Sequence, residues 1–385
     1  MRKKIIGVFT AGMLFASAAC CPVHAAGVSA VSALVLEPFT DTVLYEQDAD
    51  RRMLVASTTK IMTAMVVLEH CSLSELVEIT PAHAAVEGSS MYLRPGEDYT
   101  VEELLYGLLL ASGNDAAAAL ADHCAGSMEA FAALMNEKCT ELELQNTHFA
   151  NSHGLDAEDH YSTARDLAHI TAAAMEIPAF CEMFSTQSKT IHGITYINHN
   201  KLLGSCPGCI GGKTGYTEAA GRILVSCVER EGMRLICVTI SDPSDWEDHA
   251  ALYDAIFSAW QFIPLPGERW QCLETISGTQ NAVRLMSDSP GIVTPKDTNV
   301  HLVARLPRFV FAPVLAGTAA GEIELWGNDS LLSKIPVYYG ETVPMDSSLS
   351  ISAWERFRRL WFLSGGIYYL TEAAGRAAAY GKGIA

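Results

Sequence analysis

The stretch Ser57-Thr58-Thr59-Lys60, followed directly by the apolar, helix-favouring run Ile61–Glu69, decides how the rest of the chain is interpreted. Three residues apart on a helix, Ser57 and Lys60 share one face. A serine hydroxyl is a weak nucleophile that needs a base, and a lysine amine can be that base where burial or a neighbouring cation lowers its pKa. The helix N-terminus favours negative charge that develops near Ser57. Because ordinary helices can also begin with this pattern, it indicates an active site only together with further motifs elsewhere in the chain.

Two further motifs of this kind occur later in the chain. Ser112-Gly113-Asn114 lies in a predicted helix–helix connection, and Lys213-Thr214-Gly215 precedes a predicted strand, Arg222–Val228. In this order, the three motifs match the serine set of penicillin-binding proteins and class A β-lactamases. A chance origin is improbable at average residue frequencies.

The segment 27–262 is predicted to form one α+β unit, because strands at both ends of this range enclose a series of helices. The predicted strands are Val31–Glu37, Thr42–Tyr45, Arg222–Val228 and Met233–Ile240. The predicted helices are Ile61–Glu69, Val101–Leu110, Ala116–Ala121, Met128–Cys139, Thr163–Met175 and Glu247–Phe262. We therefore expect an antiparallel sheet assembled from distant segments and flanked by helices.

Two different segments follow this unit. Residues 267–348 are predicted to form a small all-β domain, because short β-rich runs alternate with turn residues; the runs are Ala282–Met286, Val300–Ala304, Phe309–Leu315 and Glu322–Trp326. Residues 351–385 favour helix and carry five basic against two acidic residues. Trp354, Phe357 and Trp361 recur there at helical spacing, which favours an amphipathic helix on a membrane surface over packing against the β domain.

The N-terminus, residues 1–25, is predicted to be a signal peptide. Three basic residues precede the apolar run Ile5–Ala19, and Val23-His24-Ala25 fits a small-residue cleavage site. A short membrane anchor, or a lipoprotein modified at Cys20 or Cys21, are the alternatives. The chain is therefore expected to be exported to the outer face of the cytoplasmic membrane.

Composition narrows the classes of function. The 385 residues are 49% apolar and 18% charged, which excludes a disordered chain or a coiled coil. The net charge of −18 repels phosphate backbones, so we expect no nucleic-acid partner. No long uncharged apolar run occurs in the middle of the chain, which excludes a multi-span membrane protein.

On these motifs the chain resembles the low-molecular-mass penicillin-binding proteins, the serine-type D-alanyl-D-alanine carboxypeptidase family. The resemblance is close over about residues 30–262. Four further stretches are typical of that family: Asn146–Phe149, Asn151–Asp156, Tyr161–Ala168, and Asn198–Leu203 leading to Gly212–Thr217. The resemblance implies a β-lactamase/transpeptidase-like fold and removal of the terminal D-Ala from peptidoglycan stem peptides, with β-lactam antibiotics as covalent inhibitors.

The family pattern agrees with the roles that the residue types allow. Ser57 attacks the substrate carbonyl and Lys60 takes its proton, while Ser112 relays a proton to the leaving amine. Asn114 holds the substrate amide. Lys213 and Thr214 bind the terminal carboxylate, and Gly215 lets the strand approach closely. Backbone N–H groups of Ser57 and Tyr216 form the oxyanion hole. Which lysine or serine acts as base in each step stays open.

The sequence departs from its relatives at two places. Related enzymes often carry Arg where His199 stands, and some carry one just before the last helix of the unit, whereas Asp242–Ala250 contains none. Anchoring of the substrate carboxylate is therefore expected to rest on Thr214 and Lys213.

Three other patterns have ordinary explanations. Glu141–Asn146 resembles the deacylating loop of class A β-lactamases, but it continues a predicted helix, so we interpret it as a helix end. His148, His153, Asp156 and His160 suggest zinc only by proximity in sequence, and we expect neither a metal nor a cofactor. Cys206 and Cys209 are interpreted as two unlinked thiols, with a tight disulfide as the alternative.

The sequence thus predicts a serine D-Ala-D-Ala carboxypeptidase. Two alternatives stay open, a β-lactamase and a catalytically inactive wall-binding protein.

Overall fold

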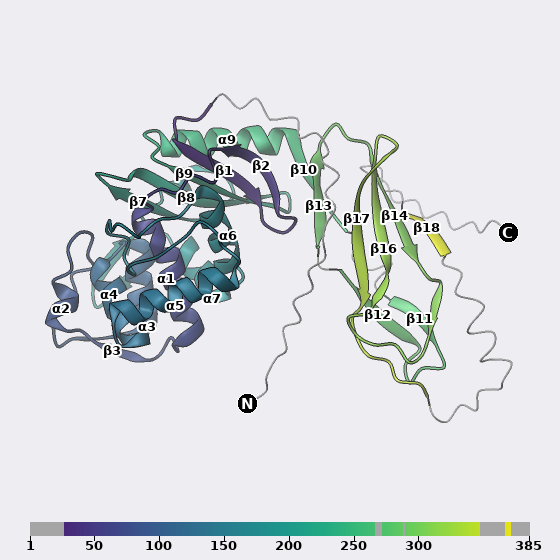
Figure 1. Ribbon diagram of the computed structural model, residues 1–385, viewed down its shortest axis with the longest axis horizontal. Coiled ribbons are helices and arrows are strands. Elements are labelled where there is room, and N and C mark those ends of the chain that lie inside the picture. The colour runs from purple at the N-terminus through teal and green to yellow at the C-terminus, as the bar shows by residue number, and fades with distance from the viewer. Residues whose placement is uncertain (1–26, 266–271, 288, 347–365, 371–385) are drawn as a thin grey trace. The chain divides into compact units, whose positions relative to one another are not determined.

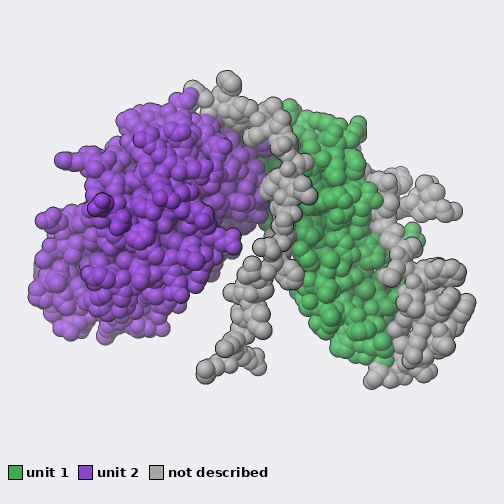
Figure 2. Space-filling view, viewed as in Figure 1, with its two compact units in different colours: residues 1–21, 263–385 green, residues 22–262 purple. Residues whose placement is uncertain are grey.

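The computed structural model describes residues 27–265, 272–287, 289–346 and 366–370. They fall into two compact units that divide between Phe262 and Ile263 (Figure 2). The expected signal peptide, and the helix expected at the start of the 351–385 tail, lie outside the described residues.

The first unit is built on a five-stranded antiparallel sheet in the order β2-β1-β9-β8-β7. The strands are β1 (Ser32–Glu37), β2 (Thr42–Gln47), β7 (Cys209–Thr217), β8 (Gly221–Arg230) and β9 (Met233–Ile240). Ser32–Leu36 pairs with Ile236–Ile240, so the sheet joins the two ends of the unit. β1 is buried along its whole length and β8 from Ile223 to Val228, as expected for strands covered on both faces.

Helices cover both faces of this sheet (Figure 1). α9 packs on β8 and β9 from one side, while α6 packs on β1 and β9, and α3, α4, α5 and α7 surround α1. The helices are η1 (Ala56–Thr59), α1 (Lys60–His70), α2 (Pro81–Ala84), α3 (Val101–Leu110), α4 (Asn114–Ala125), α5 (Met128–Glu141), α6 (Ala164–Ala174), α7 (Pro178–Ser185), α8 (Leu202–Ser205) and α9 (Asp245–Ala259). Two small hairpins, β3 (Leu76–Glu78) with β4 (Asp98–Thr100) and β5 (Ser188–Ile191) with β6 (Ile194–Ile197), complete the unit.

Helix α1 is the centre of the hydrophobic core. Its residues from Lys60 to Val67 are all buried, and α3, α4, α5, α6 and α7 pack around it. Apolar residues on every side of a helix are typical of one that is buried in a core. The start of α1 is thereby held in a fixed position beneath the sheet edge.

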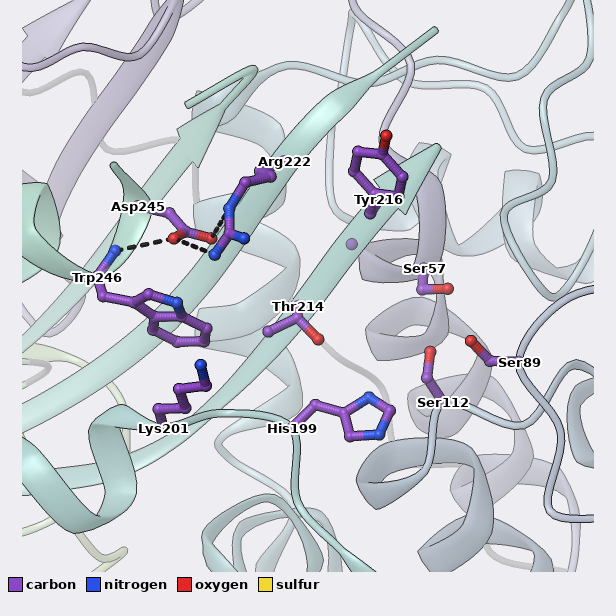
Figure 3. A pocket seen from close by; sticks show the side chains of 11 residues that line it. Ser57, Ser89, Ser112, His199, Lys201, Thr214, Tyr216, Arg222, Asp245 and Trp246 are labelled. Atoms are coloured by element: carbon purple, nitrogen blue, oxygen red, sulfur yellow. Dashed lines mark hydrogen bonds and ion pairs between the residues drawn. The ribbon is translucent and has the colours of Figure 1, made fainter. Parts of the chain in front are cut away.

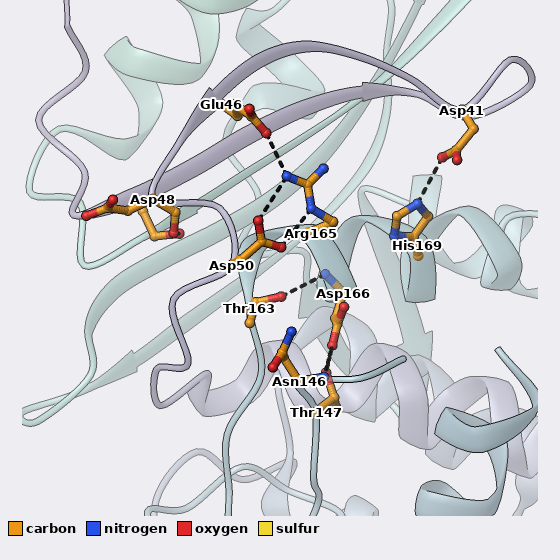
Figure 4. Close-up of polar contacts among 11 residues, drawn as sticks. Asp41, Glu46, Asp48, Asp50, Asn146, Thr147, Thr163, Arg165, Asp166 and His169 are labelled. Atoms are coloured by element: carbon orange, nitrogen blue, oxygen red, sulfur yellow. Dashed lines mark hydrogen bonds and ion pairs between the residues drawn. The ribbon is translucent and has the colours of Figure 1, made fainter. Parts of the chain in front are cut away.

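Polar contacts fasten α6 to the loops around it (Figure 4). Arg165 forms ion pairs with Glu46 on β2 and with Asp50. Asp166 accepts hydrogen bonds from the Asn146 backbone N–H and from Thr147 Oγ1, at 3.0 and 2.7 Å. The stretches around residues 146 and 165, which are typical of the family, therefore stabilise the packing of α6 against the neighbouring loops.

The second unit is an all-β domain. Its main sheet has the order β15-β11-β12-β17-β16-β14-β18. The strands are β11 (Cys272–Ile276), β12 (Ala282–Met286), β14 (Val300–Leu306), β15 (Phe309–Phe311), β16 (Ala319–Gly327), β17 (Ser330–Tyr339) and β18 (Gly366–Leu370), and a separate pair joins β10 (Trp260–Pro264) to β13 (Gly291–Pro295).

Three predicted elements differ in the structure. The helix expected to reach Phe262 ends at Ala259, because β-favouring residues before Pro264 form β10 instead. The strand expected over Phe309–Leu315 stops at Phe311, before Pro313, which has no N–H for a ladder. Within the tail that favoured helix, residues 366–370 form a strand on β14.

Candidate active site

The first motif sits where η1 runs into α1. Ser57 is partly exposed in η1, whereas Lys60 is fully buried as the first residue of α1. The Lys60 Nζ lies 2.9 Å from Ser57 Oγ. The spacing in sequence therefore places amine and hydroxyl in direct contact, as predicted.

The second motif completes the surroundings of Lys60. The Lys60 Nζ also lies 2.6 Å from Asn114 Oδ1 and 3.3 Å from Ser112 Oγ. Ser112 adopts a left-handed backbone conformation (φ 58°) in the turn between α3 and α4. Asn114 Nδ2 donates to the Glu87 carbonyl at 2.6 Å, which fixes which way the amide faces.

The third motif approaches from the edge strand β7. Lys213 is buried, and its Nζ donates to Ser112 Oγ at 3.0 Å and to the Thr214 carbonyl at 2.9 Å. A Cβ placed on Gly215 would lie 3.3 Å from the Ser57 nitrogen, so β7 runs tightly against η1. Ser112 is thus held between the two lysines.

Burial shifts the pKa of both lysines downward. The pKa of Lys60 lies well below its usual range, first because the amine is buried and second because Lys213 is near; Asp115 opposes the shift. Burial lowers the pKa of Lys213 to about 7. A neutral Lys60 beside a cationic Lys213 is the arrangement that a lysine base requires.

Above these residues opens a pocket of about 630 Å³ (Figure 3). Ser57, Ser112, Thr214, Gly215 and Tyr216 line it, as predicted. The other lining residues were not predicted from the sequence to take part in catalysis or binding; they are Ser89, His199, Lys201, Arg222, Asp245 and Trp246.

Arg222 stands out among these other lining residues. It lies on β8 opposite Tyr216, and its guanidinium forms hydrogen bonds of 2.6 and 3.2 Å with the buried carboxylate of Asp245. The Trp246 ring lies 5.9 Å from both the Arg222 guanidinium and the Lys201 amine. The alternation of β8 puts Arg222 on the same face as Ser226, which contacts His249 of α9, and no local sequence pattern reveals that contact.

Gly154 is a second residue whose role the sequence did not reveal. It has φ 87°, and a Cβ on it would lie 3.0 Å from the Ser57 nitrogen and would collide with the Ala56 carbonyl. His160 supports the same turn, because its Nε2 lies 2.8 Å from Thr59 Oγ1 while its Nδ1 accepts from the Ala150 N–H. The loop 150–160 therefore buttresses the serine.

The other patterns fall outside the pocket lining. Glu141 is the last residue of α5 and pairs with Lys138, so the helix-end interpretation is confirmed. The Nδ1 of His148 and the Nδ1 of His153 contact the Asp159 carbonyl and the Leu155 N–H. Cys206 and Cys209 are free thiols.

Comparison with known proteins identifies the family. Residues 20–244 match the family model described as D-alanyl-D-alanine carboxypeptidase. The chain is 32% identical to D-alanyl-D-alanine carboxypeptidase DacF of Bacillus subtilis, over 80% of this chain and 84% of that protein. It is 32% identical to DacC of Escherichia coli, over 83% and 86%.

A solved structure agrees with this assignment. Penicillin-binding protein 5 of Haemophilus influenzae superposes with a TM-score of 0.70 at 26% identity, covering 83% of this chain and 98% of that one. The α+β fold with a following β domain is that of these enzymes. The chain therefore belongs to the serine D-alanyl-D-alanine carboxypeptidase family, the low-molecular-mass penicillin-binding proteins.

Proposed function

We propose that this protein removes the terminal D-Ala from peptidoglycan stem peptides through an acyl-enzyme on Ser57. The observation that carries the proposal is the contact of the Lys60 amine with oxygens of Ser57, Ser112 and Asn114. A neutral amine has two N–H donors and one lone pair. With the N–H groups directed to Asn114 and Ser112, the lone pair is left for the Ser57 proton.

The remaining steps follow from the neighbours. As Ser57 Oγ attacks the carbonyl carbon of the penultimate D-Ala, Lys60 takes the hydroxyl proton. The backbone N–H groups of Ser57 and Tyr216 stabilise the oxyanion. Ser112, which contacts both lysines, passes a proton to the leaving D-Ala amine. Water then releases the shortened peptide from Ser57.

The substrate carboxylate is assigned to the cationic side of the pocket. Thr214 supplies a hydroxyl and Lys213 a positive charge there, and Arg222 and Lys201 line the same pocket. We propose that Arg222 replaces the arginines missing at position 199 and in 242–250. Its two hydrogen bonds to Asp245 hold the guanidinium in place and leave three of its five N–H donors for a carboxylate.

Exposure to penicillin tests the nucleophile. Intact mass should show one covalent adduct, mapped to the peptide that contains Ser57 and stable for minutes or longer, because no glutamate lines the pocket among the described residues. Ser57→Ala should lose both this adduct and D-Ala release from a pentapeptide, whereas Ser89→Ala, which changes another serine of the pocket, should keep the adduct on Ser57. Labelling of a different serine would contradict the assignment, and fast turnover of penicillin would favour the β-lactamase alternative.

Arg222 has a matched control on the same strand. Arg230 also lies on β8 and also pairs with α9, through Asp254, but away from the pocket. Arg222→Leu should lower kcat/KM for D-Ala-D-Ala peptides by about 10–100-fold, the loss expected for a hydrogen bond to a charged group. Arg230→Leu should leave kcat/KM unchanged. Equal effects would mean that Arg222 contributes only to the fold.

We also propose that the protein is exported and works at the outer face of the cytoplasmic membrane. The proposal rests on the signal-peptide pattern of residues 1–25 and on the basic, aromatic tail from residue 351. No helix among the described residues is long and apolar enough to cross a membrane. We propose attachment to the membrane surface through the basic, aromatic tail.

A further inference from the structure

Sulfur, nitrogen and oxygen ligand atoms converge where α1 and α4 end. Within the described part of the chain, one group of potential metal ligands comes together: the Cys71 thiol, a Glu75 carboxylate oxygen and a His123 ring nitrogen lie within 4.8 Å of one another. Cys124 follows His123 directly, and its thiol hydrogen-bonds that of Cys71. Three side chains thus converge, and the Cys124 thiol adjoins them through its contact with Cys71.

Backbone hydrogen bonds fix the segment that carries Cys71 and Glu75. Cys71 is the C-cap of α1, and its N–H donates to the Val67 carbonyl at 2.9 Å. The following turn closes through the Glu75 N–H, which donates to the Ser72 carbonyl at 3.1 Å. The Glu75 carbonyl accepts from the Val101 N–H at 2.9 Å, which ties the turn to the start of α3.

The other two ligands come from the last turn of α4. The helix ends at Gly126 in the left-handed conformation (φ 80°), whose N–H bonds the Asp122 carbonyl at 2.7 Å. His123 Nε2 already contacts Glu75 Oε2 at 2.9 Å. α1 and α4 pack against each other, so His123 and Cys124 on α4 lie beside Cys71 at the end of α1 and Glu75 in the turn that follows.

The ligand types select the ion. Ca²⁺ and Mg²⁺ take oxygen ligands, whereas two sulfurs with one imidazole and one carboxylate suit tetrahedral Zn²⁺. Bonds of about 2.0–2.3 Å to the ion require ligand atoms roughly 3–4 Å apart. Ligand atoms of Cys71, Glu75 and His123 already lie within 4.8 Å of one another, and His123 Nε2 is 2.9 Å from Glu75 Oε2. We propose that Cys71, Glu75, His123 and Cys124 bind one Zn²⁺ ion.

This zinc clamp, Cys71, Glu75, His123 and Cys124, is separate from the catalytic centre. Cys71 follows the end of the 11-residue α1, so it lies about 16 Å along the helix axis from Lys60. Likewise, His123 and Cys124 are on the last turn of α4, which begins at Asn114. The ion would join the far ends of the two helices that present Lys60 and Asn114, and thereby stabilise their packing.

Zinc stoichiometry tests the clamp. The full mature chain, reduced and stripped of metal, should bind one equivalent of zinc chloride in equilibrium dialysis with metal analysis. Cobalt chloride should give thiolate-to-cobalt charge-transfer absorption. Cys71→Ser and Cys124→Ser should lose this absorption and the bound zinc, and His123→Gln should lose the zinc. Cys181→Ser and Cys272→Ser, which remove thiols elsewhere, should keep both.

Thermal unfolding separates binding from a general effect on folding. Zinc should raise the Tm of the wild type and of Cys272→Ser but not that of His123→Gln, whose side chain is partly exposed and lies outside the hydrophobic core. The proposal is wrong if zinc binding persists in Cys71→Ser. It is also wrong if Cys71 and Cys124 are disulfide-linked in the isolated protein and the reduced chain binds no zinc.

Discussion

Ser112 contacts two lysines that must be in opposite protonation states. Its Oγ lies 3.3 Å from the Lys60 amine and 3.0 Å from the Lys213 amine. Lys60 must be neutral to accept a proton, whereas Lys213 must be charged to attract a carboxylate. Burial alone lowers both pKa values, and the charge on Lys213 lowers that of Lys60 further. Each lysine therefore depends on the protonation state of the other.

The rate of acylation should consequently pass through a maximum with pH. It rises as Lys60 loses its proton, and it falls above a pH of about 7, the pKa of Lys213, as the positive charge there is lost. Lys213→Arg should keep its charge and flatten the alkaline side. Stopped-flow acylation by penicillin across this range measures both limbs. An identical alkaline fall in the two proteins would show that another group is titrating.

Removal of the charge should be costly at any pH. We expect Lys213→Ala to slow acylation by about 10²–10³-fold, the usual loss for one preorganised electrostatic contact. Lys213→Arg should retain more of the rate, because charge survives while geometry changes. Burst kinetics with penicillin measure the rate for each variant. Acylation of Lys213→Ala at the wild-type rate would make the third motif a coincidence.

The sequence predicted the residues of the three motifs because each carries its own local chemistry. It could not predict Arg222 or Asp245, whose contact depends on how α9 lies across β8. Gly154 lies in the stretch Asn151–Asp156, which is typical of the family, but its role is not evident from the sequence. Its role depends on the distance between two loops that are far apart in sequence, and no local pattern encodes that distance.

Among the elements, the short turn η1 depends most on its neighbours. Ala56 has φ 44°, no side-chain cap hydrogen bond starts η1, and β7 and the Gly154 loop press on it from outside. The position of η1 is therefore set by tertiary contacts. If η1 moved, Ser57 Oγ would no longer be aligned with the substrate carbonyl. Misplacement by about 1 Å can cost 100-fold in rate.

Two glycines separate this effect from backbone strain. Gly154→Ala and Gly193→Ala both put a side chain on a left-handed backbone, at φ 87° and 81°. Gly193 has open space around it, whereas at Gly154 the new methyl group would collide with Ala56. Backbone strain should lower the Tm of both variants, and the collision should lower that of Gly154→Ala further. Only Gly154→Ala should slow acylation, by about 100-fold. Comparable acylation rates in the two variants would show that the Gly154 loop does not position Ser57.

Long elements were predicted well and their ends less well. α3 occupies the predicted Val101–Leu110, because a capping box of Thr100 and Glu103 marks its start. The predicted end of α9, Phe262, was wrong because Trp260 and Phe262 continue an apolar pattern that can form a helix or a strand.

At the scale of the whole molecule, the division into two units predicts that the tail and the active site can be separated. A chain that ends at Ser350 should release D-Ala from small peptides at the full rate but should not pellet with anionic vesicles. The full mature chain should pellet with them and be released by high salt or detergent, because basic and aromatic residues act together at an interface. Equal partitioning of the two chains would mean that residues 351–385 do not bind the membrane surface.

The pairing of β1 with β9 has a consequence for how the protein is made. Residues 32–36 of β1 pair with residues 236–240 of β9. β1 therefore cannot form this pairing until nearly the whole catalytic unit has been synthesised. Closing so long a loop makes folding slow. During synthesis the N-terminal hairpin exposes an unpaired edge, which is a site of aggregation in many β-proteins. A nascent chain of this design stays unfolded until about residue 240 has emerged, the state in which a polypeptide can still be threaded through a narrow channel.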